Sequence, residues 1–382
     1  MIPKKFSFYK TITFDLFNRN YYNNRACIFT YSKDNNVYIV YGVKSLDLEC
    51  YDIIQEKKYI IIKKIHRAPF ESCRQFYDKS NDRNLILTSS FDEHVKVINF
   101  NKENSEIIID LNLETNIITI INTACLINNK IFVPFSNVES GIIEIYNMNS
   151  NKIGKIKECG FILGLSGYYW KKIKIYFIIV ANLKGIFAYN EDNLSLYKKF
   201  IPKFSDEDEE YNGFDEGYIL EKNESLLLFC PCFYYGYLFC FDFINGCLIN
   251  KITLSFDSGI SDICILNKKY IFVALNQSND SHFVLINTKN NKVEKKFIEN
   301  EKESRLCGIK IVRNKSKGDY LITFNMTGKL NLYKIKKPNI FIILLCLLII
   351  CLILIYPNLH FQSKILYSFL LIFSLLIIKK YL

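Results

Sequence analysis

The chain has 382 residues, of which 50% are hydrophobic, 15% aromatic and 23% charged. This composition is enough to bury a large core, and it excludes a disordered, collagen-like or small disulfide-stapled protein. The formal net charge of +11, from 49 basic and 38 acidic residues, suits nucleic acid or an anionic membrane and does not choose between them.

The N-terminus and the thirteen cysteines both favour a cytosolic chain. The first residues, MIPKKF, lead directly into alternating residues without an apolar signal region, so we expect no secretory signal. Most cysteines, such as Cys125, Cys264 and Cys307, lie in apolar strand-like runs, which is typical of reduced and buried thiols.

Residues 1–336 are predicted to be all β, because apolar residues alternate in short runs and helical periodicity is nearly absent. A strand ending in an aromatic residue or Ile, followed by Asp or Asn, recurs at intervals of 47, 48, 43, 52, 45 and 47 residues. The pairs are Tyr51-Asp52, Ile98-Asn99, Tyr146-Asn147, Tyr189-Asn190, Phe241-Asp242, Ile286-Asn287 and a degenerate Tyr333-Lys334. Each unit holds four short strands, here lettered a to d, which is the size of a propeller blade. Two packed β-sandwiches are the alternative, and the even spacing favours a seven-bladed propeller.

The second unit begins at His66 and runs through LILTSSFDEHVKVINF. It resembles a WD40 repeat, in which a His opens the blade, Ser or Thr and Asp follow near the second strand, and Trp-Asp ends the third. His66, Ser90 and Asp92 match, whereas Ile98-Asn99 replaces Trp-Asp. The resemblance covers about residues 7–336, strongly only in this unit. It implies that His66, Ser90, Asp92 and Asn99 form a structural hydrogen-bond network that is at most partial.

The seventh unit supplies only three strands before the C-terminal apolar run begins. The segment 6–17 (FSFYKTITFDLF) precedes the first unit and belongs to none. We predict that it forms the outer strand of the seventh blade, since an open ring would leave an unpaired strand edge.

No catalytic, cofactor-binding or metal-binding pattern is found, so we predict a non-enzyme without cofactor, metal or small-molecule substrate. Of the four His, His66 fits a structural blade position, His94 falls in a turn, and His282 and His360 have no partner pattern. Cys230 and Cys232, near Cys240 and Cys247, need only share one face of a strand. One acidic run starts like a calcium loop but has Tyr211 and Gly217 where that loop needs Gly and Glu. We interpret it as a solvated loop that can serve as a partner-binding element: Asp206, Glu207, Asp208, Glu209 and Glu210.

Residues 337–382 are predicted to be a C-terminal membrane anchor. The 17 apolar residues of 340–356 would form a helix about 25 Å long, close to the thickness of a bilayer core. The 14 residues of 365–378 fit a second transmembrane helix and equally a re-entrant or interfacial helix. Lys379 and Lys380 resemble the dilysine retrieval signal of endoplasmic-reticulum membrane proteins, which works in the cytosol; interfacial anchoring explains them equally well.

The predicted turns between strands a and b lie on the face from which the chain would leave the ring. We call this the a–b face and the opposite one the d–a face. These turns carry thirteen basic and six acidic residues, a surplus of +7, and we expect them to face an anionic leaflet. The acidic run falls on the d–a face.

The sequence therefore predicts a non-catalytic, membrane-anchored scaffold, at the endoplasmic reticulum, that presents its loops to protein partners in the cytosol. The alternative is an exchange factor for a coat-recruiting small GTPase, a family that this layout resembles. That family has a Gly-rich loop in the first blade, whereas residues 18–25 (NRNYYNNR) contain no Gly. We expect no nucleic acid as partner, because no nucleic-acid-binding module is recognised.

Overall fold

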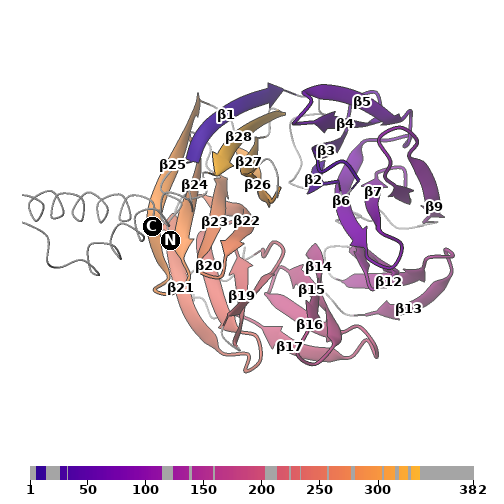
Figure 1. Ribbon diagram of the computed structural model, residues 1–382. Helices are drawn as coiled ribbons and strands as arrows, with labels where there is room; N and C mark the ends of the chain where they lie inside the picture. Colours follow the sequence, from indigo (N-terminus) through magenta and orange to yellow (C-terminus); the bar gives the residue numbers. More distant parts are fainter. Residues whose placement is uncertain are drawn as a thin grey trace, which may run out of the picture.

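A computed structural model describes residues 6–335 apart from 14–25, 32, 114–123, 137–139, 158–159, 203–212, 223–224, 233, 256–257, 277–279, 303–304, 315–317 and 326–327. The strands of this part form seven four-stranded antiparallel sheets. Figure 1 shows the sheets arranged as blades around one centre, so the predicted seven-bladed propeller is confirmed.

The first three blades follow chain order from the innermost strand outward. Blade 1 consists of β2 (Ala26–Thr30), β3 (Val37–Gly42), β4 (Leu48–Asp52) and β5 (Lys57–Ile62). Blade 2 consists of β6 (Phe70–Asp78), β7 (Arg83–Ser90), β8 (His94–Asn99) and β9 (Glu106–Asn112). Blade 3 consists of β10 (Cys125–Ile127), β11 (Lys130–Ser136), β12 (Gly141–Asn147) and β13 (Lys152–Ile156).

Blades 4 to 6 repeat this arrangement. Blade 4 consists of β14 (Ile162–Trp170), β15 (Ile175–Asn182), β16 (Ile186–Asn190) and β17 (Leu196–Phe200). Blade 5 consists of β18 (Tyr218–Lys222), β19 (Ser225–Pro231), β20 (Gly236–Asp242) and β21 (Leu248–Ser255). Blade 6 consists of β22 (Gly259–Asn267), β23 (Tyr270–Asn276), β24 (Asp280–Asn287) and β25 (Lys292–Lys302).

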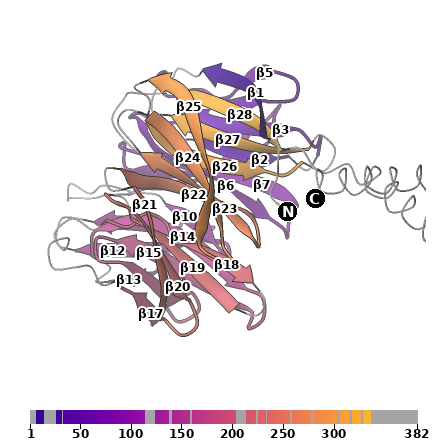
Figure 2. The same ribbon diagram turned by 90° about the vertical axis from the view of Figure 1, so that its left-hand side faces the viewer.

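Blade 7 joins the two ends of the described chain. Its inner strands are β26 (Leu306–Val312), β27 (Asp319–Asn325) and β28 (Lys329–Ile335), and its outer strand is β1 (Phe6–Thr13). β1 lies beside β28 and pairs with it antiparallel (Figure 1, Figure 2). The pairing contains a bulge between Phe8 and Lys10. Of the segment 6–17 expected here, residues 14–17 lie outside the described part.

The repeated Asp or Asn ends the third strand of each of the first six blades and shapes the turn that follows. In five of these blades its side-chain Oδ1 accepts the backbone N–H two residues later, at 2.8–2.9 Å. These five residues are Asp52, Asn147, Asn190, Asp242 and Asn287. The Asx side chain caps the start of a turn in which a later residue takes a positive φ, such as Glu56 at 55° and Gly246 at 78°. The turn thus depends on the Asp or Asn at this position, which explains why the pair marks the blades in the sequence.

The hydrophobic core lies between the blades rather than at the ring's centre. Each of the seven buried clusters in the described part joins two neighbouring blades. Between blades 4 and 5, for example, the rings of Phe200 and Phe243 stack with centroids 5.4 Å apart. Because apolar side chains on both faces of a sheet are buried, the strands are close to continuously hydrophobic.

Candidate functional site

His66 lies at the entry to blade 2 and is 2% exposed. Its Nδ1 lies 3.1 Å from both carboxylate oxygens of Asp92, and its Nε2 lies 2.9 Å from the hydroxyl of Thr88. Asp92 also accepts the backbone N–H of Arg67 at 2.7 Å and of His94 at 3.1 Å. The carboxylate therefore ties the connection entering blade 2 to the turn between β7 and β8.

Burial opposes the charged form of Asp92, but these hydrogen bonds outweigh it and hold the pKa of its carboxyl well below the usual range. The ring of His66 also packs edge-on against Phe70, with centroids 5.0 Å apart. A His enclosed in this way has no access to a substrate. The arrangement can therefore stabilise the blade.

The other two residues singled out in blade 2 take different positions. Ser90 donates to the backbone oxygen of Ala68 at 2.9 Å and does not bond His66, whose hydroxyl partner is Thr88. Asn99 donates to Glu106 on the outer strand at 3.2 Å, at the exposed edge of the blade. Thr88 and Ser90 are two residues apart on β7, and both carry a hydroxyl that could bond His66. The residue type alone does not show which of the two is the partner.

The remaining predicted residues lie outside the described part. They are the acidic run 206–210 and the lysines at 379 and 380, together with the apolar segments 340–356 and 365–378. Within residues 6–335, less the gaps given above, the structure contains no helix long and apolar enough to cross a membrane.

The described cysteines are mostly buried thiols. Cys27 and Cys73 approach to 3.6 Å between blades 1 and 2, and burial raises the pKa of the Cys27 thiol. Cys230 and Cys232 pack in the cluster between blades 4 and 5. No group of three His, Cys, Asp or Glu side chains in the described residues is arranged to hold a metal ion.

A second polar network spans the centre of the ring. Arg74 on β6 forms an ion pair with Glu216, and its Nη1 donates to the backbone oxygen of Leu165 on β14 at 2.6 Å. Because blade 3 separates blades 2 and 4 in the ring, the guanidinium must reach past β10 to make these contacts.

A further set of polar contacts joins blades 5 to 7 through Asp262 on β22. The hydroxyl of Tyr218 donates to this carboxylate, which also accepts the backbone N–H of Ile309 at 2.9 Å and pairs with Lys310 at 3.0 Å. Burial, followed by the charges of Asp262 and Asp215, raises the pKa of Tyr218. Polar contacts thus join the first strands of blades 2 and 4, and a separate set joins those of blades 5, 6 and 7.

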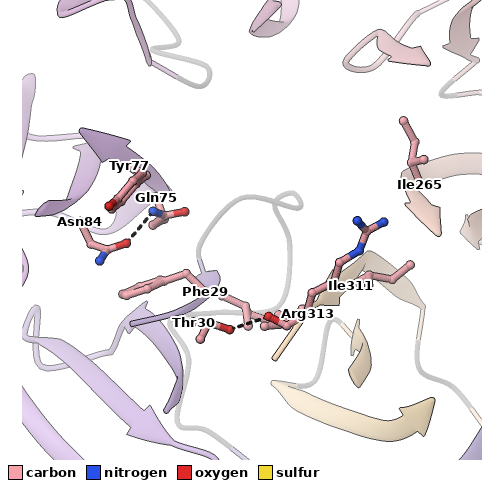
Figure 3. Close-up of a pocket in the computed structure, with 10 residues that line it drawn as sticks. Phe29, Thr30, Gln75, Tyr77, Asn84, Ile265, Ile311 and Arg313 are labelled. Atoms are coloured by element: carbon pink, nitrogen blue, oxygen red, sulfur yellow. Dashed lines mark hydrogen bonds between the residues drawn. The ribbon is translucent and has the colours of Figure 1, made fainter. Parts of the chain in front are cut away.

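A cavity of about 540 Å³ lies beside this network, between blades 1, 2, 6 and 7. Figure 3 shows its wall: the paired amides of Gln75 and Asn84 on one side, Phe29 and Thr30 next to them, and Ile311, Arg313 and Ile265 opposite. Along β6, β22 and β26 the network residues precede the cavity residues in sequence. Since all first strands run toward the a–b face, the cavity lies at the a–b end of the centre.

Similar solved structures are propellers at low sequence identity. A chain in the crystal structure of BBS1N in complex with ARL6DN, soaked with lead, aligns with a TM-score of 0.62 and 12% identity, over 87% of this chain and 97% of that chain. A chain of the mitotic checkpoint complex aligns with a TM-score of 0.63 and 8% identity, over 87% and 96%. No protein-family model and no curated protein matches the sequence. The chain is therefore a seven-bladed β-propeller of WD40-like fold.

Proposed function

We propose that the chain is a non-catalytic scaffold, anchored in the membrane of the endoplasmic reticulum, whose propeller presents its d–a face to protein partners in the cytosol. The observation that carries this proposal is a set of large apolar side chains exposed on that face. They are Phe91, Leu183, Ile201 and Tyr234, which are 52%, 38%, 50% and 48% exposed.

These four side chains lie at the ends of rigid strands. Phe91, Leu183 and Tyr234 occupy the turns between the second and third strands of blades 2, 4 and 5, and Ile201 directly follows β17. A Cβ placed on Gly185 would lie 3.2 Å from the Cα of Ile201, so the turn holding Leu183 packs beside Ile201. Apolar and aromatic anchors held on a rigid frame are typical of protein interfaces.

The structural neighbours support protein partners, since their crystal structures are of a complex of BBS1N with ARL6DN and of the mitotic checkpoint complex. The place where the ring ends supports the anchor. β28 ends at Ile335 on the a–b face, and the apolar run 340–356 begins five residues later. This order would leave the d–a face directed away from the bilayer.

The partner surface is tested by proximity labelling of the full chain and of Leu183→Ser/Ile201→Ser/Tyr234→Ser. Ile60→Ser/Ile249→Ser is the control, because these side chains are 51% and 49% exposed on outer strands away from the d–a face. Interface anchors cost at least about 2 kcal/mol when truncated, so enrichment of the main partners should fall about thirtyfold only in the triple variant. Equal labelling by both variants would contradict the proposed surface.

Two further measurements test the other parts of the proposal. Extraction with alkaline carbonate should leave the full chain in the membrane pellet, and its release would refute the anchor. Incubation with small GTPases should not accelerate nucleotide release, and acceleration would refute the non-catalytic role.

A further inference from the structure

Exposed lysines surround the cavity end of the ring's centre. Turns between first and second strands lie around this end, because they join each innermost strand to its neighbour. In blades 2, 4 and 6 these turns carry Lys79, Lys171, Lys172, Lys174, Lys268 and Lys269, all exposed. None of the six forms an ion pair with another described residue, so their charges are available to an external anion.

The acidic residues of the neighbouring blade 2 turn are already engaged. Asp78 accepts hydrogen bonds from Arg83 at 2.8 Å, from Asn81 at 2.8 Å and from the hydroxyl of Ser80 at 2.5 Å. Asp82 accepts the hydroxyl of Tyr77. Arg83 balances the charge of Asp78, and the Tyr77 hydroxyl occupies one oxygen of Asp82, so both carboxylates already have partners within the turn.

An apolar tip accompanies the lysines in blade 4. Ile173 stands between Lys172 and Lys174 in a four-residue turn and is 42% exposed. Tyr169, 39% exposed, is separated from this turn by one strand residue, and its ring packs at a tilt of 35° against that of Tyr176, with centroids 4.5 Å apart. Lysines alone would be enough to bind an acidic peptide. An apolar tip flanked by lysines and tyrosines is instead typical of a protein surface that contacts a bilayer interface.

Arg313 offers a specific anion contact at the mouth of the cavity. Its Nη2 donates to the backbone oxygen of Leu266 at 2.8 Å, and no other described residue accepts from the guanidinium. Because a guanidinium has five N–H donors in one plane, several remain to bind a phosphate in a bidentate manner. The cavity of about 540 Å³ is within the usual size range of small-molecule sites.

We propose that the a–b face docks the ring onto an anionic bilayer. In this arrangement Ile173 enters the interface, the six lysines contact charged headgroups, and Arg313 binds a lipid phosphate at the cavity. The proposal rests on the proposed function, because the bilayer is the one that holds the anchor. It goes further by naming the side chains that make the contact with the lipid.

Trp170 is the single Trp of the chain and directly precedes the Lys171–Lys174 turn, so its fluorescence reports on docking. The full chain is reconstituted into phosphatidylcholine vesicles with or without phosphatidylserine, each containing a phosphatidylcholine with a nitroxide on its headgroup. We expect stronger quenching of Trp170 in the anionic vesicles, and we expect added salt to reverse it.

Variants on the two faces identify the residues responsible. Each removed charge should lower the ratio of docked to undocked rings about fivefold, so Lys171→Gln/Lys172→Gln/Lys174→Gln should abolish the extra quenching and Arg313→Gln should reduce it. The matched control is Lys63→Gln/Arg67→Gln/Lys184→Gln, which removes three exposed charges from the d–a face. Ile173→Ser should reduce quenching, and Leu183→Ser, in the opposite turn of the same blade, should not.

Several outcomes would overturn the proposal. Equal quenching with and without phosphatidylserine excludes an anionic surface, and equal loss in both triple variants excludes the a–b face. If inorganic phosphate alone causes an Arg313-dependent change in neutral vesicles and removes the effect of phosphatidylserine, the ligand is free phosphate. If an oligoglutamate peptide binds the detergent-solubilised chain through the a–b lysines and Ile173→Ser leaves quenching unchanged, the occupant is an acidic protein segment.

Failure of docking and failure of the anchor are distinguishable. A chain that does not float with neutral vesicles refutes the anchor. A chain that floats, but whose Trp170 is equally quenched in neutral and anionic vesicles, refutes docking alone. A sharp thermal unfolding transition of each variant, measured by circular dichroism, shows that the ring is intact.

Discussion

Blades 2 and 7 are both four-stranded sheets, but they are assembled from different parts of the chain. Blade 2 takes all its strands from residues 70–112, and His66, Thr88 and Asp92 join its entry to its second and third strands. Blade 7 combines residues 306–335 with residues 6–13 from the other end of the chain. A blade can therefore be stabilised by local hydrogen bonds, whereas the ring can be closed only by a pairing of distant segments.

The contacts of the closing strand show how this pairing is fixed. Thr11 on β1 donates to the side-chain oxygen of Asn331 at 2.6 Å, and the amide of Asn331 donates to the buried Glu299 of blade 6 at 2.8 Å. Glu299 also accepts the hydroxyl of Tyr333 at 2.7 Å. The N-terminal strand is thus joined through β28 to the neighbouring blade as well as to its own.

The largest effect is expected from deletion of residues 1–17, which removes β1 and exposes the edge of β28. An unpaired edge in a ring stabilised by its closure promotes aggregation, so we expect loss of cooperative unfolding. Circular dichroism melting and light scattering measure it. Deletion of residues 1–5, which precede β1, is the control and should leave the melt unchanged; a sharp melt after the longer deletion would show that blade 7 closes without β1.

The next largest effect is expected from breaking the ion pair between Arg74 of blade 2 and Glu216. Arg74→Met removes the cation facing Glu216, whose side chain is 15% exposed, and leaves that charge without its ion-pair partner. Breaking a buried pair in this way costs about 3 kcal/mol, measurable by urea denaturation. Arg74→Met/Glu216→Gln should recover part of the loss. If it recovers none, packing of the arginine rather than the charge pair holds the blades together.

A smaller effect is expected within blade 2. Asp92→Asn removes the charged acceptor of His66 and should cost about 1–3 kcal/mol at neutral pH. The pKa of Asp92 is lowered by folding, so its contribution is complete above about pH 4 and declines as the pH falls toward the lower folded-state value. We therefore expect the difference in unfolding free energy between the original protein and Asp92→Asn to decrease from pH 7 to pH 3. Denaturation of both proteins across this range measures it.

The control for Asp92 is the second His–Asp pair of the same blade. His94 and Asp110 lie 2.6 Å apart, but the carboxylate side chain is 43% exposed. Exposed pairs contribute about 0–1 kcal/mol, so Asp110→Asn should have little effect. Equal losses in Asp92→Asn and Asp110→Asn would mean that burial of the network does not matter.

The smallest expected difference in stability is between variants of two of the repeated turn residues, Asp242 and Asn99. Asp242→Ala removes the acceptor of the Ile244 and Asn245 N–H groups and should cost about 1 kcal/mol. Asn99→Ala removes only an exposed contact with Glu106 and should stay within about 0.5 kcal/mol. Thermal denaturation of both variants makes the comparison, and a larger loss from Asn99→Ala would contradict the role assigned to the Asx turn.

The blade count and the ends of the third strands could be predicted, because in five blades the Asp or Asn that ends the strand also forms its turn. The choice between Thr88 and Ser90 could not, because residues two apart in a strand share one face. Only the position of the His66 ring at the blade's entry decides that Thr88 is its partner. The C-terminal segments and the acidic run remain predictions, since they lie outside the described residues.

The sequence by itself determined seven similar units and an N-terminal strand without a partner of its own, because strand periodicity and turn chemistry depend on neighbouring residues. Only the tertiary structure decided that Arg74 meets Glu216, that Asp262 meets Lys310, and that a cavity opens beside them toward the lysine-rich turns. These contacts depend on how steeply each blade is set against the next. Packing at the seven interfaces between blades fixes the angle between neighbouring blades, and this angle cannot be read from any short stretch of sequence.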